Sequence, residues 1–136
     1  MTNLTLAQSL IRKATDRLDI LDLLFKKGAY SDVVREAQEI VELAMKGMLR
    51  AVGVEPPKFH DVGGLLVEHR EKFPGPISRQ ADRIATISKR LKKERELSFY
   101  GDIDFIPTEE YKIEDAMEAI EEANFVVRTA KKLKET

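Results

Sequence analysis

The apolar residues of the chain recur every three or four positions over four long stretches, which is the spacing of amphipathic α-helices. The first stretch runs from Leu6 to Phe25 without an internal proline or glycine. Gly28 predicts its end, and Ser31 is the predicted N-cap of the next helix. Because this connection is short, we expect the two helices to pack antiparallel.

The second predicted helix, residues 32–52, has an apolar band too wide to be covered by one partner. We therefore expect it to lie at the centre of the fold, and Gly53 to end it. Its polar strip contains pairs of opposite charge four residues apart, such as Glu42 with Lys46. Such pairs predict salt bridges on a solvated helix face.

Prolines and glycines then divide the rest of the chain. Pro56 and Pro57 cannot continue the helix, and Asp61 is placed to cap a short helix over residues 62–72. Two more long helices follow, and their predicted starts and ends are Pro76 to Leu97 and Thr108 to Leu133. The pattern predicts one all-α domain over residues 1–136, a bundle of four long helices plus one short helix.

Composition agrees with a single packed domain. Of the 136 residues, 43% are apolar and 35% are charged, and the net charge of −1 provides no overall attraction to nucleic acid or anionic membrane. The absence of cysteine excludes disulfides and a cysteine nucleophile. Because no signal-peptide pattern and no run of about eighteen apolar residues is present, we expect a cytoplasmic protein without membrane contact.

Common catalytic and nucleotide-binding motifs are absent. The sequence has no phosphate-binding glycine loop, no zinc-protease or serine-hydrolase motif and no calcium loop. Its two histidines, His60 and His69, lack acidic partners at metal-ligand spacing, so we expect neither a metal site nor a cofactor.

The loop that contains His60 and Asp61 has two interpretations. In the first, Asp61 caps the short helix and the histidine ring closes the loop. In the second, these two residues converge with the end of the central helix and with a later loop, which contains Tyr100 and Asp102, to hold a polar ligand.

Two stretches resemble the HEPN domain family, the higher eukaryotes and prokaryotes nucleotide-binding domains. Residues 30–66 resemble its core signature, and residues 98–123 resemble its C-terminal half. The positions that carry the resemblance are Ala37, Gln38, Glu42, Lys46, Leu49, Gly53, Pro56 or Pro57, His60, Asp61, Tyr100, Asp102, Pro107, Tyr111, Ala116, Ala119 and Ala123.

The resemblance implies an up-and-down helical bundle that commonly forms a homodimer. Many prokaryotic members are paired with a minimal nucleotidyltransferase as a toxin–antitoxin system, which implies such a partner here. RNase members carry an Arg, then four to six intervening residues, then a His. In this sequence the required positions hold Gly, Val and Glu before His60, and Val, Gly and Gly before His69, so the motif is absent.

Arg95 and Tyr100 repeat the spacing of that motif with a phenol in place of the imidazole. A phenol with a pKa of about 10 is a poor base at neutral pH, so RNA cleavage is disfavoured. Because partner nucleotidyltransferases adenylylate a family tyrosine, Tyr100 is also a candidate for modification. Its structural alternative is an aromatic residue that closes the end of the bundle.

One helix carries a local excess of positive charge. Between Arg79 and Arg95 there are seven cations and two acids. A solvated helix face is the first interpretation, and a phosphate site, whose affinity would fall with salt, is the second. Few aromatic residues accompany the run, so RNA is the less favoured ligand.

The leading hypothesis is a non-catalytic HEPN-type interaction or nucleotide-binding module, a homodimer with a nucleotidyltransferase partner. Its candidate ligand-binding residues are Lys46, His60, Asp61, Arg95, Tyr100 and Asp102. The alternatives are an RNase toxin with a non-standard Arg/Tyr site and a purely structural dimeric bundle.

Overall fold

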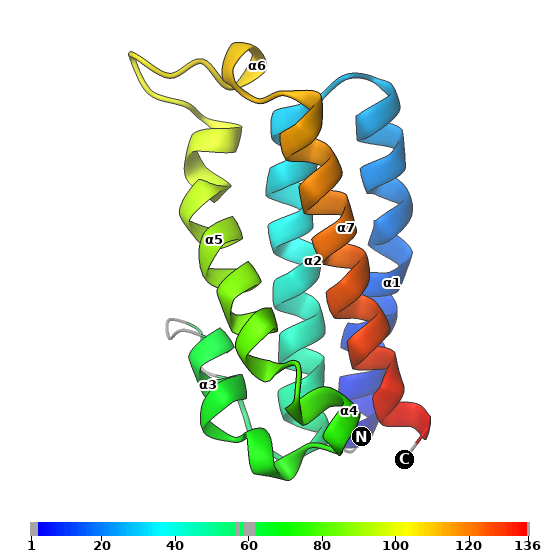
Figure 1. Cartoon of the computed structure of the whole chain (residues 1–136). Helices are drawn as coiled ribbons and strands as arrows, with labels where there is room; N and C mark the ends of the chain where they lie inside the picture. The colour runs from blue at the N-terminus through cyan, green and yellow to red at the C-terminus, as the bar shows by residue number, and fades with distance from the viewer. Residues whose placement is uncertain (1–2, 57, 59–61, 136) are drawn as a thin grey trace.

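Four long helices run alternately up and down in the computed structural model, which describes residues 3–56, 58 and 62–135 (Figure 1). They are α1 (Asn3–Lys26), α2 (Tyr30–Ala51), α5 (Ala81–Phe99) and α7 (Ile113–Lys131). This arrangement confirms the predicted all-α bundle.

Short elements connect the long helices at the two ends of the bundle. They are α3 (Val62–Glu68), η1 (Arg70–Lys72), α4 (Gly75–Ser78) and α6 (Pro107–Glu110), and a final short element, η2 (Lys132–Glu135), follows α7. The start of α1, the end of α7, α3 and α4 lie at one end, and α6 lies at the other (Figure 1). Besides the predicted short helix, the structure therefore has two further one-turn helices, α4 and α6.

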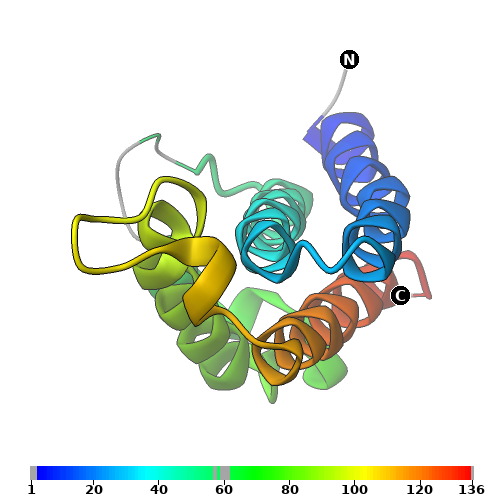
Figure 2. The same ribbon diagram turned by 90° about the horizontal axis from the view of Figure 1, so that it is seen from above.

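The helix α2 lies at the centre of the bundle, as the width of its apolar band predicts. It packs against α1, α5 and α7, and the view along the bundle shows it between them (Figure 2). Its apolar residues on all three sides are buried, among them Ala37, Ile40 and Met48. Every residue of α2 is buried or partly buried, its seven charged residues included.

The start of α2 differs from the prediction. The N–H groups of Gly28 and Ala29 donate to the carbonyls of Phe25 and Leu24 at 3.0 Å, a Schellman motif that requires the positive φ of Gly28. The next helix begins immediately, with Ala29 as its N-cap. The predicted cap at Ser31 is wrong, because the motif leaves no residue for a linker and places that serine inside the helix.

The start of the last helix is also displaced. Thr108 belongs to the single turn of α6, and α7 begins only at Ile113. Between them Tyr111 is extended, because its side chain is buried and its hydroxyl donates to the Glu94 carboxylate. The predicted Thr108 cap is therefore wrong. The Asp115 carboxylate caps α7 instead, because it accepts the backbone N–H of Lys112, the residue before the helix.

The predicted helix from Pro76 to Leu97 is divided in two. The N–H of Gln80 donates to the carbonyl of Ile77, three residues back, and this tighter turn separates α4 from α5. Pro76 is in the first turn of α4, as predicted. The predicted cap at Asp61 lies outside the described residues.

A partly buried ion pair joins α1 to α2. The Arg17 guanidinium donates to both oxygens of the Glu36 carboxylate, at 2.6 and 3.2 Å. The Glu36 side chain is only 9% exposed, and its hydrogen bond with the guanidinium raises the pKa of Arg17. The pair satisfies a carboxylate that would otherwise be buried without a partner.

Candidate functional site

Two cations lie one turn apart near the end of α2. Lys46 and Arg50 are four residues apart, so they share one face of the helix. After Ala51 the chain turns back, because the N–H groups of Gly53 and Val54 donate to the carbonyls of Arg50 and Leu49. This Schellman motif, with φ +82° at Gly53, directs the following loop along the face that carries the two cations.

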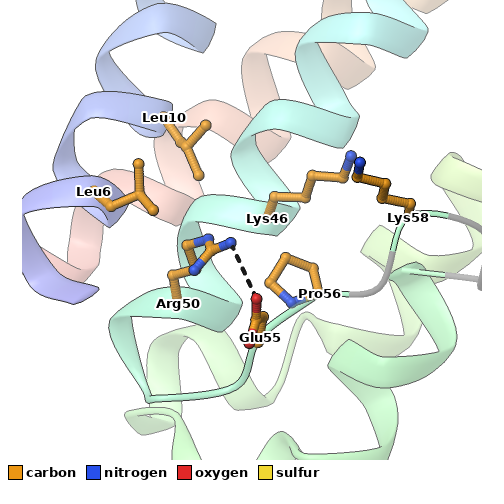
Figure 3. Close-up of a pocket in the computed structure, with 7 residues that line it drawn as sticks. All are labelled: Leu6, Leu10, Lys46, Arg50, Glu55, Pro56 and Lys58. Atoms are coloured by element: carbon orange, nitrogen blue, oxygen red, sulfur yellow. Dashed lines mark ion pairs between the residues drawn. The ribbon is translucent and has the colours of Figure 1, made fainter.

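The loop adds a third cation to the same place. In Figure 3 the side chains of Lys46 and Lys58 point toward one another, and Pro56 lies beside them on the loop. Together with α1, these residues line a cavity of about 610 Å³. Cavities of this volume are typical of sites for small molecules and cofactors.

The opposite wall of the cavity is apolar. Leu6 and Leu10, one turn apart on α1, face it (Figure 3). The wall stands close to the cations because Gly47 allows α1 to approach α2: a Cβ at this glycine would lie 2.7 Å from Ile11 Cγ1. The cavity thus combines an apolar wall with a cationic one.

Positive charge exceeds negative charge in this cavity. Its described lining residues include three cations and one carboxylate, that of Glu55. Glu55 approaches Arg50 at 3.9 Å, and Lys46 approaches Glu42 outside the cavity at 3.7 Å. These distances are long for ion pairs and Glu55 is exposed, so an anion could replace either contact at little cost.

The lining residues are suited to holding an anion. Lysine and arginine side chains donate hydrogen bonds to phosphate oxygens, and an apolar wall accommodates a sugar or base. Among the described residues that line the cavity, Glu55 is the one carboxylate, and no histidine, serine or aspartate is present. We therefore describe it as a candidate anion-binding site.

The structure brings only part of the predicted site to this cavity. Lys46 lines it, whereas His60 and Asp61 lie outside the described residues. Tyr100 and Asp102 follow α5, which rises to the end of the bundle opposite to the end of α2 (Figure 1). A helix of the length of α5 spans about 28 Å, so the end of α2 and the Tyr100 loop do not converge.

The remaining predicted residues belong to the far end of the bundle. Tyr100 is 76% exposed. The Asp102 carboxylate accepts the N–H of Ile103 at 2.7 Å, which gives it a role in the local turn. The backbone of Arg95 is in α5, but its side chain lies outside the described residues.

The basic run on α5 is partly used in packing. The guanidinium of Arg83 lies 3.8 Å from the centre of the Phe125 ring, and Arg90 pairs with Glu118 and Glu122 of α7. The lysines of the run are exposed, and they are Lys89, Lys92 and Lys93. The run therefore consists of helix contacts and a solvated face, and none of its three lysines lines the cavity beside α1 and α2.

Sequence reasoning did not include Arg50, Lys58, Leu6 and Leu10 in the site. The sequence pattern that points to the two added cations is a Lys and an Arg four residues apart, followed within eight residues by a glycine stop, two prolines and another lysine. Within the described part of the chain, no helix has the length and apolar composition to cross a membrane. The same residues contain no cluster of three or more potential metal ligands.

Comparison with known families agrees with the resemblance to the HEPN domain family. A model of the HEPN domain matches residues 7–133, which include most of α1 and all of α2, α5 and α7. Comparison with curated proteins finds no match. Since the match extends over nearly the whole chain, the protein belongs to the HEPN domain family.

Proposed function

We propose that the chain is a binding module for a nucleotide, whose phosphates are held by Lys46, Arg50 and Lys58. The observation that carries the proposal is the convergence of these three cations, two from α2 and one from the loop, on one cavity. Phosphate groups are recognised by such clusters of charged donors. Membership of the HEPN family suggests a nucleotide-binding or RNase-type module and is consistent with this assignment.

The apolar wall favours a nucleotide over inorganic phosphate. Leu6, Leu10 and Pro56 present aliphatic surface opposite the cations, where a ribose or base could cover it. Removing that surface from water contributes about 25 cal/mol per Å². Single-stranded RNA is less favoured, because RNA sites usually stack bases on aromatic rings and no aromatic residue lines this cavity.

Isothermal titration calorimetry with ATP, AMP and GTP tests the proposal on matched variants. The cavity variant replaces Lys46, Arg50 and Lys58 with Ala. Its control replaces the exposed lysines of α5, Lys89, Lys92 and Lys93, with Ala and removes the same charge. Each contact contributes about 1 kcal/mol at 4 Å in water, so the loss of three contacts, about 3 kcal/mol together, should weaken binding about 100-fold.

The affinity of the control variant should lie within about twofold of the wild-type affinity. Added salt should weaken nucleotide binding by the wild type and by the control variant. An equal or larger loss in the control would assign binding to the basic run on α5 instead. No binding of any nucleotide to wild type would contradict the proposal.

Two finer parts of the hypothesis concern partners: the homodimer was predicted from the family resemblance and the wide apolar band of the central helix, and the nucleotidyltransferase from the resemblance alone. We propose that the chain forms a homodimer and pairs with a minimal nucleotidyltransferase. Size-exclusion chromatography with light scattering tests the first, and a monomer at micromolar concentration would contradict it. Co-purification with the product of a neighbouring nucleotidyltransferase gene tests the second, and separate elution would contradict it.

A further inference from the structure

A tight turn presents an isoleucine to solvent at the end of the bundle opposite to the cavity. The backbone groups of Asp102 and Phe105 exchange two hydrogen bonds, at 2.9 and 3.0 Å. Gly101 has φ +72°, and a Cβ there would lie 2.6 Å from the Phe105 carbonyl oxygen, so the turn requires glycine. At its tip Ile103 is 93% exposed.

The turn is anchored to the bundle. The Phe105 ring meets the Tyr111 ring edge-on, with centroids 5.6 Å apart. The Tyr111 hydroxyl in turn donates to the Glu94 carboxylate on α5. Burial and this carboxylate raise the pKa of Tyr111, which keeps the hydroxyl protonated as a donor. Ile103 is therefore held in place by a defined structure.

Exposed apolar residues concentrate in this region. Eight large apolar residues are exposed in the described part of the chain, and five of them fall within residues 100–117. The five are Tyr100, Ile103, Ile106, Ile113 and Met117. We call residues 100–117 the α6 surface. Exposed apolar residues gathered in one region are typical of a protein interaction site.

The α6 surface is also strongly acidic. It contains six exposed carboxylates and a single cation, Lys112. The carboxylates are Asp102, Asp104, Glu109, Glu110, Glu114 and Asp115. Such a field repels nucleic acid and anionic lipid, and it attracts a partner that carries lysine and arginine.

We propose that the α6 surface binds a segment of another protein that combines apolar side chains with lysine and arginine. A second copy of the chain fits less well, because a two-fold contact would place this acidic surface against itself. Apolar side chains of the partner would cover Ile103 and Met117, and its cations would meet the surrounding carboxylates. The proposal is independent of the nucleotide site, which lies at the other end of the bundle.

A displayed random peptide library, selected on the full chain, tests this proposal. The enriched peptides should combine apolar residues with Lys or Arg. Two variants then locate their binding: Ile103→Ser/Met117→Ser removes apolar surface, and Glu109→Lys/Glu114→Lys reverses charge. The matched control, Leu4→Ser/Leu23→Ser, removes two apolar residues of α1 that are also more than half exposed.

Each α6-surface variant should weaken binding of the enriched peptides about tenfold or more, and the control should leave it within about twofold. All substituted side chains are exposed, and circular dichroism verifies that each variant is folded. Enrichment of acidic peptides, or equal binding by wild type and both α6-surface variants, would overturn the proposal. So would a wild-type dimer that Ile103→Ser/Met117→Ser converts to a monomer, since the surface would then be a contact between copies of the chain.

Discussion

Gly47 is the residue at which α1 and α2 approach each other beside the cavity. A Cβ at this position would lie 2.7 Å from Ile11 Cγ1 and 3.1 Å from the Ala7 carbonyl oxygen. The first atom belongs to the stem of a buried side chain and the second to the backbone, so neither can move away alone. Gly47→Ala must therefore push the two helices apart.

Two opposing effects determine how Gly47→Ala changes the free energy of unfolding. Alanine is favoured over glycine inside a helix by about 1 kcal/mol. Overpacking of a close contact costs about 1–3 kcal/mol, and here it involves two groups of α1. We expect Gly47→Ala to lower the free energy of unfolding by about 1–2 kcal/mol and the melting temperature by about 3–8 °C.

Urea denaturation of Gly47→Ala, Ile11→Ala and the double variant measures the stability lost in Gly47→Ala and shows whether contact with Ile11 causes it. Because Ile11→Ala removes the Cγ1 atom, Gly47→Ala should cost less in that background, with a coupling energy of about 1 kcal/mol. A Gly47→Ala protein that is about 1 kcal/mol more stable than wild type would refute the reasoning, since helix propensity alone would then explain the result.

Three further predictions concern single charged or polar groups. Glu55→Gln removes the one carboxylate of the cavity and should tighten ATP binding up to about fivefold, measured by calorimetry; weaker binding would contradict this. Arg17→Met should lower the stability measured in urea by about 1–3 kcal/mol, because Glu36 then stays buried without a partner. Adding Glu36→Leu should recover most of this loss. Tyr111→Phe should cost about 1 kcal/mol at pH 7, through the lost hydrogen bond to Glu94. Because the pKa of Tyr111 is raised in the folded state, its contribution is complete below about pH 10 and is lost at higher pH. Urea melts at alkaline pH should thus lose stability less steeply in the variant than in wild type.

Helical periodicity was sufficient to predict the four long helices and the central place of α2, because a continuous apolar stripe must be buried. Helix ends were harder to predict. The break before α7 depends on the burial of Tyr111 and its bond to Glu94 of α5, a contact between residues distant in sequence. The displaced start of α2 depends on a Schellman motif that no single cap residue reveals.

The candidate site was only partly predictable for a similar reason. Lys46 could be selected from the sequence, and Arg50 shares its helical face. Whether Lys58 joins them depends on the direction of the loop after Gly53, which is set by backbone hydrogen bonds. The proposed convergence with Tyr100 failed because the length of α5 separates the two ends of the bundle.

The most direct test of the account is an NMR titration of the isotopically labelled protein with ATP, which reports the binding site residue by residue. We predict saturable shifts of backbone amides in residues 6–10 of α1 and 46–50 of α2, and of the amides of Glu55 and Lys58 in the loop, whose two prolines have no N–H. Shifts confined to residues 89–93 of α5, or no shift with excess nucleotide, would contradict it.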